Sequence, residues 1–144
     1  MQHIDSLGHH EAQIAIDAIR AELLQRGQAA VIAVTDPYGE LIGLLRLDGA
    51  KLPSIQIAAN KAWTAARERK PTRELGQAAR HPADGFDMAY FGDPRYIGWG
   101  GGLPVVIDER VVGAVAVSGL PEQEDMILAK LGVAAILAAV MAGG

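Results

Sequence analysis

Residues 29–47 read AAVIAVTDPYGELIGLLRL, and this stretch decides the fold class of the chain. Two aliphatic runs flank the sequence Asp-Pro-Tyr-Gly at residues 36–39, in which proline sets φ for a turn and glycine tolerates a positive φ. We therefore expect strands over Ala29–Thr35 and Glu40–Leu47, joined as a hairpin. Hairpin strands are antiparallel neighbours, so the stretch favours an α+β fold over a doubly wound parallel sheet.

A second hairpin is predicted further along the chain. Leu103–Ile107 and Val111–Val117 are apolar runs joined by Asp-Glu-Arg at 108–110. Tyr96–Trp99 is predicted as a further short strand, which gives a single antiparallel sheet of about five strands. The preceding stretch, His81–Arg95, is rich in proline, glycine and aspartate, and we expect an irregular loop there.

Helices are expected on either side of the two hairpins. The first covers Leu7–Arg26, with Ser6 or Asp5 as its N-cap and Gly27 just past its end. The next two are Ser54–Arg69, which starts after Pro53 and is stopped by Pro71, and Arg73–Arg80, which Thr72 would cap. The last helix opens at Pro121, and Ser118 would contribute to its cap. Ser118 is also a candidate ligand-binding residue.

Length and composition narrow the class of protein. The chain of 144 residues is expected to form one domain, residues 1–144. A net charge of −4 argues against a nucleic-acid-binding protein, and the lack of cysteine excludes thiolate chemistry. No secretory signal is recognisable at the start, so a cytoplasmic location is expected. The most apolar run, Met126–Met141, is interrupted by Lys130 and is shorter than a membrane span, which predicts a buried helix.

Several side chains could bind a ligand. Lys61 and Thr64 are three residues apart in an alanine-rich helix, where Lys61 could hold a carboxylate or act as a base, although a solvated surface lysine is the commoner explanation. Arg46 and Asp48 have the spacing of one strand face. Six cations against two glutamates make a basic patch of residues 61–80.

The glycine-rich stretch at 98–102 matches no nucleotide-binding motif, because no helix follows it. Gly101 and Gly102 could still offer free backbone amides to an anion, or could simply form a turn. Among the histidines, His81, His9 and His10 are candidate haem ligands, although surface histidines are commoner. Met88, Tyr90 and Tyr96 are weaker candidates of the same kind.

The motifs, taken in order, resemble the GlcG/HbpS-like family, which includes the C-terminal domain of PduO-type proteins. The matching pieces run from about residue 10 to residue 140. They are Ala-Val-Thr-Asp at 33–36 with Gly39, Leu-Arg-Leu-Asp-Gly-Ala at 45–50, A-x-x-K-A-x-T-A-A at 58–66, Lys-Pro-Thr at 70–72, Gly-Gly-Leu-Pro-Val at 101–105, Val-Gly-Ala at 112–114, and Val-Ser-Gly at 117–119 with Asp125.

The resemblance implies a profilin-like fold, homo-oligomers and, for some members, haem binding. This chain departs from the family in two places: it has no export signal like that of the secreted haem-binding members, and Ala116 replaces the glycine of Gly-Val-Ser-Gly. The axial haem ligand differs among members, so the resemblance assigns no residue to that role.

Three functions follow as hypotheses. The first is a cytoplasmic haem- or tetrapyrrole-binding protein, in which Lys61, Thr64, Arg46 and the glycine loop would lie near the propionates. The second is an isomerase, tautomerase or lyase acting on a small carboxylate. Lys61 or Arg46 would hold that acid, Gly101 and Gly102 would stabilise an enolate-like charge, and Asp48 or Asp125 would move a proton. The third is a non-catalytic partner subunit of an oligomer. Neither a nucleic acid nor a membrane is expected as a partner.

Overall fold

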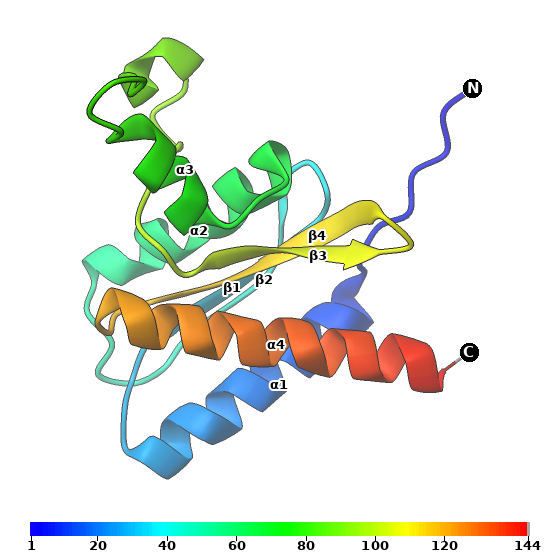
Figure 1. Ribbon diagram of the computed structural model, residues 1–144. Coiled ribbons are helices and arrows are strands. Elements are labelled where there is room, and N and C mark those ends of the chain that lie inside the picture. The colour runs from blue at the N-terminus through cyan, green and yellow to red at the C-terminus, as the bar shows by residue number, and fades with distance from the viewer. Residues whose placement is uncertain (144) are drawn as a thin grey trace.

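A computed structural model describes residues 1–143, and its centre is an antiparallel sheet (Figure 1). The four strands are β1 (Val31–Thr35), β2 (Leu41–Arg46), β3 (Gly102–Ile107) and β4 (Arg110–Ser118), and their order across the sheet is β2-β1-β4-β3. Both predicted hairpins are present, and the two hairpins join through the pairing of β1 with β4. The predicted α+β class with a single antiparallel sheet is confirmed.

The prediction of about five strands is wrong within residues 1–143, because residues 96–99 form no strand. The amide of Ile97 donates to the Thr64 hydroxyl at 3.2 Å rather than to a neighbouring strand. Gly98 lies directly against the backbone of Gly76, where even a Cβ atom would collide. The segment is therefore held by a side chain and a helix instead of by a sheet ladder. The profilin-like label stays a prediction.

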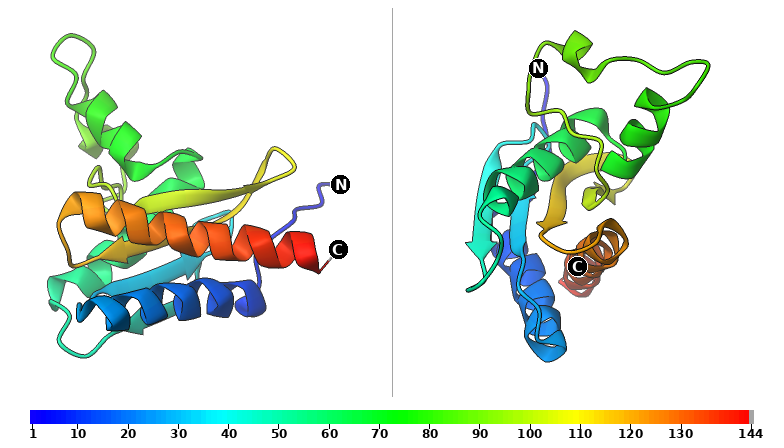
Figure 2. Two further views of the ribbon diagram at one scale, coloured as in Figure 1. Left: turned by 60° about the horizontal axis from the view of Figure 1, so that its bottom comes forward. Right: turned by 90° about the vertical axis from the view of Figure 1, so that its left-hand side faces the viewer.

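Helices cover both faces of the sheet (Figure 2). α1 (His9–Arg26) and α4 (Glu122–Ala142) lie on one face, while α2 (Pro53–Glu68) and the short α3 (Thr72–Ala79) lie on the other. A single turn of 3-10 helix, η1 (Met88–Phe91), interrupts the predicted irregular loop. Two cores result, one on each side of the sheet.

Successive side chains along a strand point to opposite faces of the sheet, and this alternation separates the two cores. On β1, Val31 and Ala33 belong to the core under α2, while Ile32 and Val34 belong to the core under α1 and α4. The core under α2 is built mostly of alanines from the helix and from β4. Small side chains let a helix approach a sheet closely, and this brings the α2 backbone against β3: a Cβ at Gly102 would collide with the Lys61 carbonyl.

Helix ends differ from expectation in three places. α1 starts at His9 after Gly8, not after Ser6 or Asp5, because the Leu7 amide is already bonded to the carbonyl of Val112 in β4 at 2.9 Å. Pro71, not Thr72, is the N-cap of α3. Pro121, not Ser118, is the N-cap of α4. The predicted stop of α1 is confirmed, since Gly27 adopts φ +66°.

An aromatic cluster organises the loop that precedes β3. Tyr96 meets the Trp63 ring edge-on at 4.7 Å and stacks on Phe91 at 4.1 Å. The guanidinium groups of Arg67 and Arg95 lie 4.7 and 4.3 Å from the Trp63 ring centroid. The loop projects from the rest of the molecule beside α3 (Figure 1) and exposes much of its aromatic surface.

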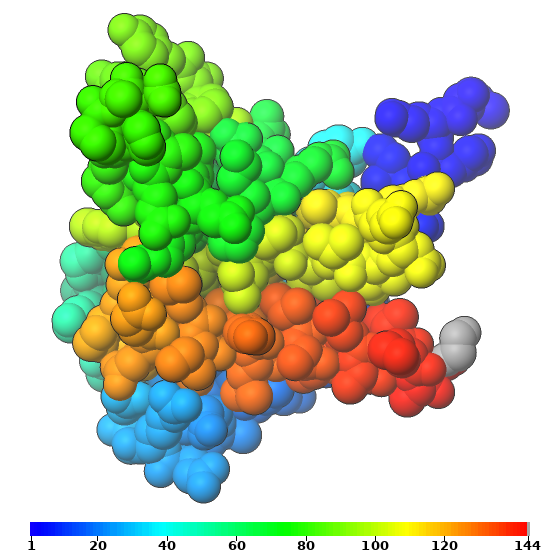
Figure 3. Space-filling view, viewed as in Figure 1, coloured from blue at the N-terminus to red at the C-terminus, as the bar shows by residue number. Residues whose placement is uncertain are grey.

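α4 runs across the face of the molecule that Figure 3 shows. Apolar residues of this helix that are exposed form a stripe along it. The stripe is spaced four and three residues apart in turn and consists of Ile127, Leu131, Ala134, Ala138 and Met141. By length and composition alone α4 could cross a membrane, a test that core helices of soluble proteins also pass. Only 28% of its most apolar window is buried inside this chain, so the chain alone does not provide the full cover expected for the buried helix at Met126–Met141.

Candidate functional site

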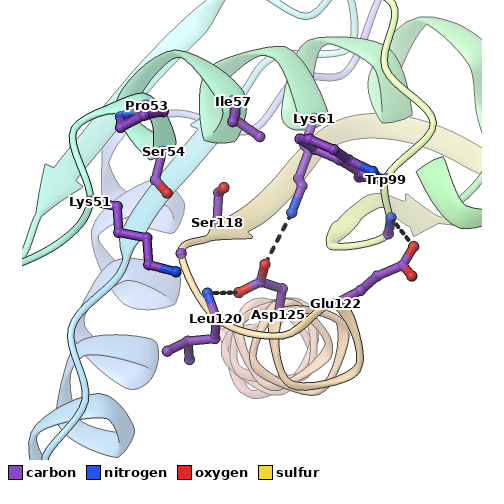
Figure 4. Close-up of a pocket in the computed structure, with 12 residues that line it drawn as sticks. Lys51, Pro53, Ser54, Ile57, Lys61, Trp99, Ser118, Leu120, Glu122 and Asp125 are labelled. Atoms are coloured by element: carbon purple, nitrogen blue, oxygen red, sulfur yellow. Dashed lines mark hydrogen bonds and ion pairs between the residues drawn. The ribbon is translucent and has the colours of Figure 1, made fainter.

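A cavity of about 440 Å³ opens where the start of α2, the end of β4 and the start of α4 meet (Figure 4). This size falls in the range of small-molecule sites. Its wall combines charged, hydroxyl and apolar side chains with the backbone of two glycines. The lining residues are Lys51, Pro53, Ser54, Ile57, Lys61, Trp99, Gly100, Ser118, Gly119, Leu120, Glu122 and Asp125.

Lys61 and Asp125 form a buried ion pair in this wall. Lys61 is 2% exposed, and its Nζ lies 3.1 Å from Asp125 Oδ2 and 3.0 Å from the carbonyl oxygen of Val117. The other oxygen of Asp125 accepts the Leu120 amide at 3.1 Å. The solvated surface lysine that the helix pattern favoured is therefore wrong, because α2 turns Lys61 towards the end of β4.

Burial acts on both members of the pair. It lowers the pKa of the Lys61 ammonium and raises the pKa of the Asp125 carboxyl, because each charged form loses hydration. The attraction between the two charges opposes both shifts. The pair can consequently give up or take a proton more readily than two solvated side chains, which is the property that general acid–base chemistry uses.

Two serines add hydroxyl groups to the cavity. Ser54 and Ser118 are each 4% exposed, and Figure 4 shows both hydroxyls turned into the cavity. Neither hydroxyl has a hydrogen-bond partner among residues 1–143. Lys51 lies at the rim, exposed, with its ammonium directed towards the same space. These donors are available to a ligand.

The glycine loop approaches the Lys61–Asp125 pair closely, and the amides of two of its glycines are already bonded. Gly101 has φ +123°, and a Cβ there would lie 2.8 Å from Lys61 Nζ and 2.7 Å from the Val117 carbonyl oxygen. The amide of Gly102 donates to the Thr72 hydroxyl at 3.0 Å, and that of Gly100 donates to Glu122 at 2.6 Å. At Gly100 and Gly102 the amides are therefore used inside the fold.

Other predicted site residues lie outside this cavity. Arg46 ends β2 and Asp48 lies in the following loop, both exposed. Thr64 is buried, but its hydroxyl accepts the Ile97 amide and donates to the Arg95 carbonyl at 3.1 Å, so it anchors the aromatic loop. The structure thus brings together Lys61, Asp125, Gly101 and Ser118 and leaves Arg46, Asp48 and Thr64 elsewhere.

The predicted basic patch is not one continuous surface. Lys61 is buried against Asp125, Arg73 pairs with Glu122 at 3.0 Å, and Arg67 lies over the Trp63 ring. Each of these three cations is thereby held by a local partner.

The candidate haem ligands are exposed. His9 and His10 form the first two residues of α1 and do not line the cavity beside Lys61. His81 Nδ1 accepts the amides of Ala83 and Asp84 at 3.1 and 3.0 Å. In the neutral ring the proton then resides on Nε2, which removes the lone pair that iron would need there. Residues 1–143 hold no group of three or more His, Asp or Glu side chains placed to bind a metal ion.

Sequence reasoning missed Lys51, Ser54, Trp99 and Glu122 as lining residues. Lys51 and Ser54 flank the proline that opens α2, which is a common helix-start pattern and carries no functional signal of its own. Glu122 lies in the first turn of α4, where an acidic side chain is common because it suits the helix dipole, and it also accepts the Gly100 amide. Only the three-dimensional meeting of α2, β4 and α4 gives these residues a shared role.

A second, shallower groove follows the aromatic loop. One part, about 400 Å³, and a smaller part, about 230 Å³, share Met88 and Tyr96 in their walls. Arg80 and Trp99 line the smaller part. The groove therefore combines a thioether, a phenol, a guanidinium and a flat indole ring.

Residues 7–134 match the family model described as haem degrading protein HbpS-like. The chain belongs to the HbpS-like family. Among solved structures, this HbpS-like protein is similar to the Klebsiella pneumoniae protein ORFY, with 30% identity, a TM-score of 0.91, and coverage of 96% of this chain and 95% of the other. It is also similar to the PduOC:heme complex, with 25% identity and a TM-score of 0.84. The match covers 90% of this chain and 94% of the PduOC chain.

Among curated sequences, GlcG of Escherichia coli strain K12 is 34% identical over 112 residues, which is 78% of this chain and 81% of GlcG. The resemblance to the GlcG/HbpS-like family, including the PduO C-terminal domain, is thereby confirmed.

Proposed function

We propose that this HbpS-like protein binds haem or a related tetrapyrrole. The observation that carries the proposal is the likeness to a homologue solved as a haem complex over 90% of this chain, with a TM-score of 0.84. The description of the matching family, a haem-degrading protein, supports the same class of ligand.

The side chains that could bind iron favour the groove at the aromatic loop over the first cavity. That first cavity, lined by Lys61, Asp125, Ser54 and Ser118, is called the Lys61 cavity below. Haem iron in proteins is held by His, Cys, Met or Tyr side chains, and the Lys61 cavity is lined by none of these. Met88 and Tyr96 in the groove would supply a thioether or a phenol, and Arg80 could hold a propionate. Haem, when bound, supplies a redox-active iron. The protein's own contribution would be to orient the porphyrin ring through contacts with Trp99 and Tyr96.

A hemin titration followed by absorbance tests this proposal. We expect a saturable shift of the Soret band at one hemin per chain, weakened by Met88→Leu or by Tyr96→Phe. Tyr90→Phe is the matched control, because Tyr90 is 86% exposed and lines neither the groove nor the cavity beside Lys61. His81→Ala and a His9→Ala/His10→Ala double variant test the histidines. A flat response, or one no stronger than that of albumin, overturns the proposal.

We also propose that the protein forms a homo-oligomer through α4. The support is the apolar stripe on α4, in which Ile127 is 56% and Met141 is 83% exposed. Stripes with this spacing are commonly buried against another helix.

Three statements stay predictions: the small-carboxylate isomerase, tautomerase or lyase, the non-catalytic partner subunit, and the cytoplasmic location. The comparisons favour neither of the two alternative functions over haem binding.

A further inference from the structure

We propose that the Lys61 cavity is a binding site for a small organic monocarboxylate, separate from the groove assigned to haem. Its donors would be the hydroxyls of Ser54 and Ser118 and the ammonium of Lys51. The inference does not depend on haem binding, because the groove at Met88 and Tyr96 shares only Trp99 with this cavity.

The net charge of the side chains that line the cavity indicates the charge of the ligand. Lys61 is neutralised by Asp125 at 3.1 Å, and Glu122 is neutralised by Arg73 at 3.0 Å. Lys51 enters no ion pair among residues 1–143. One uncompensated positive charge beside a cavity suits a monoanion better than a dianion such as phosphate.

The polar donors suit a carboxylate. Ser54 and Ser118 are both more than nine-tenths buried, and their hydroxyls face the cavity without a partner among residues 1–143 (Figure 4). Because both hydroxyls open into the cavity, each is free to donate to a ligand oxygen that replaces solvent there. An ammonium has three N–H donors, and Lys61 uses two of them on Val117 and Asp125. The third can reach a ligand oxygen.

The other residues that line the cavity can contact the apolar part of a ligand. Pro53, Ile57 and Leu120 contribute aliphatic surface, and Trp99 lies at the edge with 57% of its surface exposed. An inorganic anion would leave this surface unused. An aliphatic acid would place its carboxylate between the serines and its chain against these residues.

Tryptophan fluorescence can report binding, because the chain has two tryptophans and only Trp99 lines the cavity. Trp63 is 3% exposed and packs between Arg67 and Arg95. Butyrate and hexanoate are the probes, with butyramide as the uncharged isostere of butyrate and inorganic phosphate as a second anion. We expect both acids to change the emission saturably, and butyramide and phosphate to bind at least tenfold more weakly.

Variants locate the site. Ser54→Ala, Ser118→Ala and Lys51→Gln should each weaken butyrate binding about tenfold or more, as expected for a lost hydrogen bond to a charged group. Lys130→Gln removes an exposed lysine on α4 outside the cavity and should change nothing. Thermal unfolding by circular dichroism shows that each variant is folded, and amide NMR shifts at Ser118 and Leu120 give a second readout.

Hemin also carries carboxylates. A separate comparison must therefore show whether the carboxylate bound in the cavity belongs to a free acid or to hemin. Hemin affinity that falls with Ser118→Ala, while no free acid binds, would assign the cavity to a haem propionate and would overturn the inference of a separate site for a small acid. Butyrate binding that Ser118→Ala weakens, with hemin binding unchanged, assigns it to a free acid. Equal binding of butyrate and butyramide, no binding of butyrate or hemin, or binding insensitive to all three cavity variants overturns the inference.

Discussion

The Nζ atom of Lys61 lies 3.1 Å from Oδ2 of Asp125, although 64 residues separate the two in the chain. Each side chain is 3% exposed. Lys61 comes from the middle of α2 and Asp125 from the start of α4, and these helices lie on opposite faces of the sheet. The pair therefore ties the two layers together at the end of β4 and forms the floor of the cavity.

Removing one partner should be more harmful than removing both. Lys61→Met would leave Asp125 buried without its counter-charge, and we expect the free energy of unfolding to fall by about 3–5 kcal/mol. The double variant Lys61→Met/Asp125→Leu should recover most of this loss, since neither charge is then buried. Urea denaturation of both variants measures the difference. Glu22→Gln, which breaks a partly exposed pair with Arg26 at 3.6 Å, is the control and should cost about 0.5 kcal/mol or less. A double variant no more stable than Lys61→Met would contradict the expectation.

The pair of Asp93 and Arg95 should produce a measurable acid transition. Hydrogen bonds from the Arg95 side chain and amide lower the pKa of Asp93 to about 2. Because the pKa is lower in the folded state than the ordinary 3.8, the stabilising contribution is complete above that value and is lost as the pH falls towards 2. Carboxyl NMR shifts of Asp93 should titrate near 2. Arg95→Gln should bring the midpoint back towards 3.8, and a normal midpoint in the wild type would refute the assignment.

Gly101 should not tolerate a side chain. Its φ of +123° is rarely adopted by other residues, and a Cβ would lie 3.0 Å or closer to Val117 O, Lys61 Nζ and Asp125 Cβ. We expect Gly101→Ala to lower the free energy of unfolding by about 2 kcal/mol or more. Gly27→Ala is the matched control, because Gly27 has φ +66° with open space around it and should cost only about 1 kcal/mol. Equal losses in the two variants would show that the close contacts at Gly101 do not matter.

Thr64 should order the aromatic loop through its hydroxyl. Thr64→Val keeps the shape of the side chain but leaves the Ile97 amide and the Arg95 carbonyl without their partner. We expect faster hydrogen exchange at Ile97, a loss of about 1–3 kcal/mol in stability, and weaker hemin binding if the groove is the haem site. Thr64→Ser retains the hydroxyl and should behave like the wild type. Unchanged exchange at Ile97 in Thr64→Val would rule out this anchoring role.

The exposed stripe on α4 should control assembly. Leu131 is the second residue of the stripe and is 38% exposed, and Leu131→Glu would place a charge where another helix is expected. We expect the mass measured by analytical ultracentrifugation to drop to that of a smaller species, while circular dichroism remains that of a folded chain. Gln25→Glu, which adds the same charge at an exposed position of α1 away from the stripe, is the control. A wild-type protein that is monomeric at micromolar concentration would contradict the proposed homo-oligomer.

Much of the fold could be predicted because its signals are local. The turn at residues 36–39 and the glycine after α1 fix chain direction through their own φ angles, and both hairpins appear where the sequence placed them. The errors lie where a distant group supplied the partner. Residues 96–99 became a loop because Thr64 bound the amide of Ile97, and α1 lost its predicted cap because Leu7 paired with Val112.

The sequence by itself determined the family, the antiparallel hairpins and the presence of Lys61, Ser118 and Asp125 in motifs that match the family. Only the tertiary structure decided that these three line one cavity with Ser54 and Lys51, and that Arg46, Asp48 and Thr64 do not. The physical reason is packing. A helix pattern shows which residues share a face, but the small alanine side chains beneath α2 set how closely that face approaches the sheet, and so bury Lys61 beside Asp125.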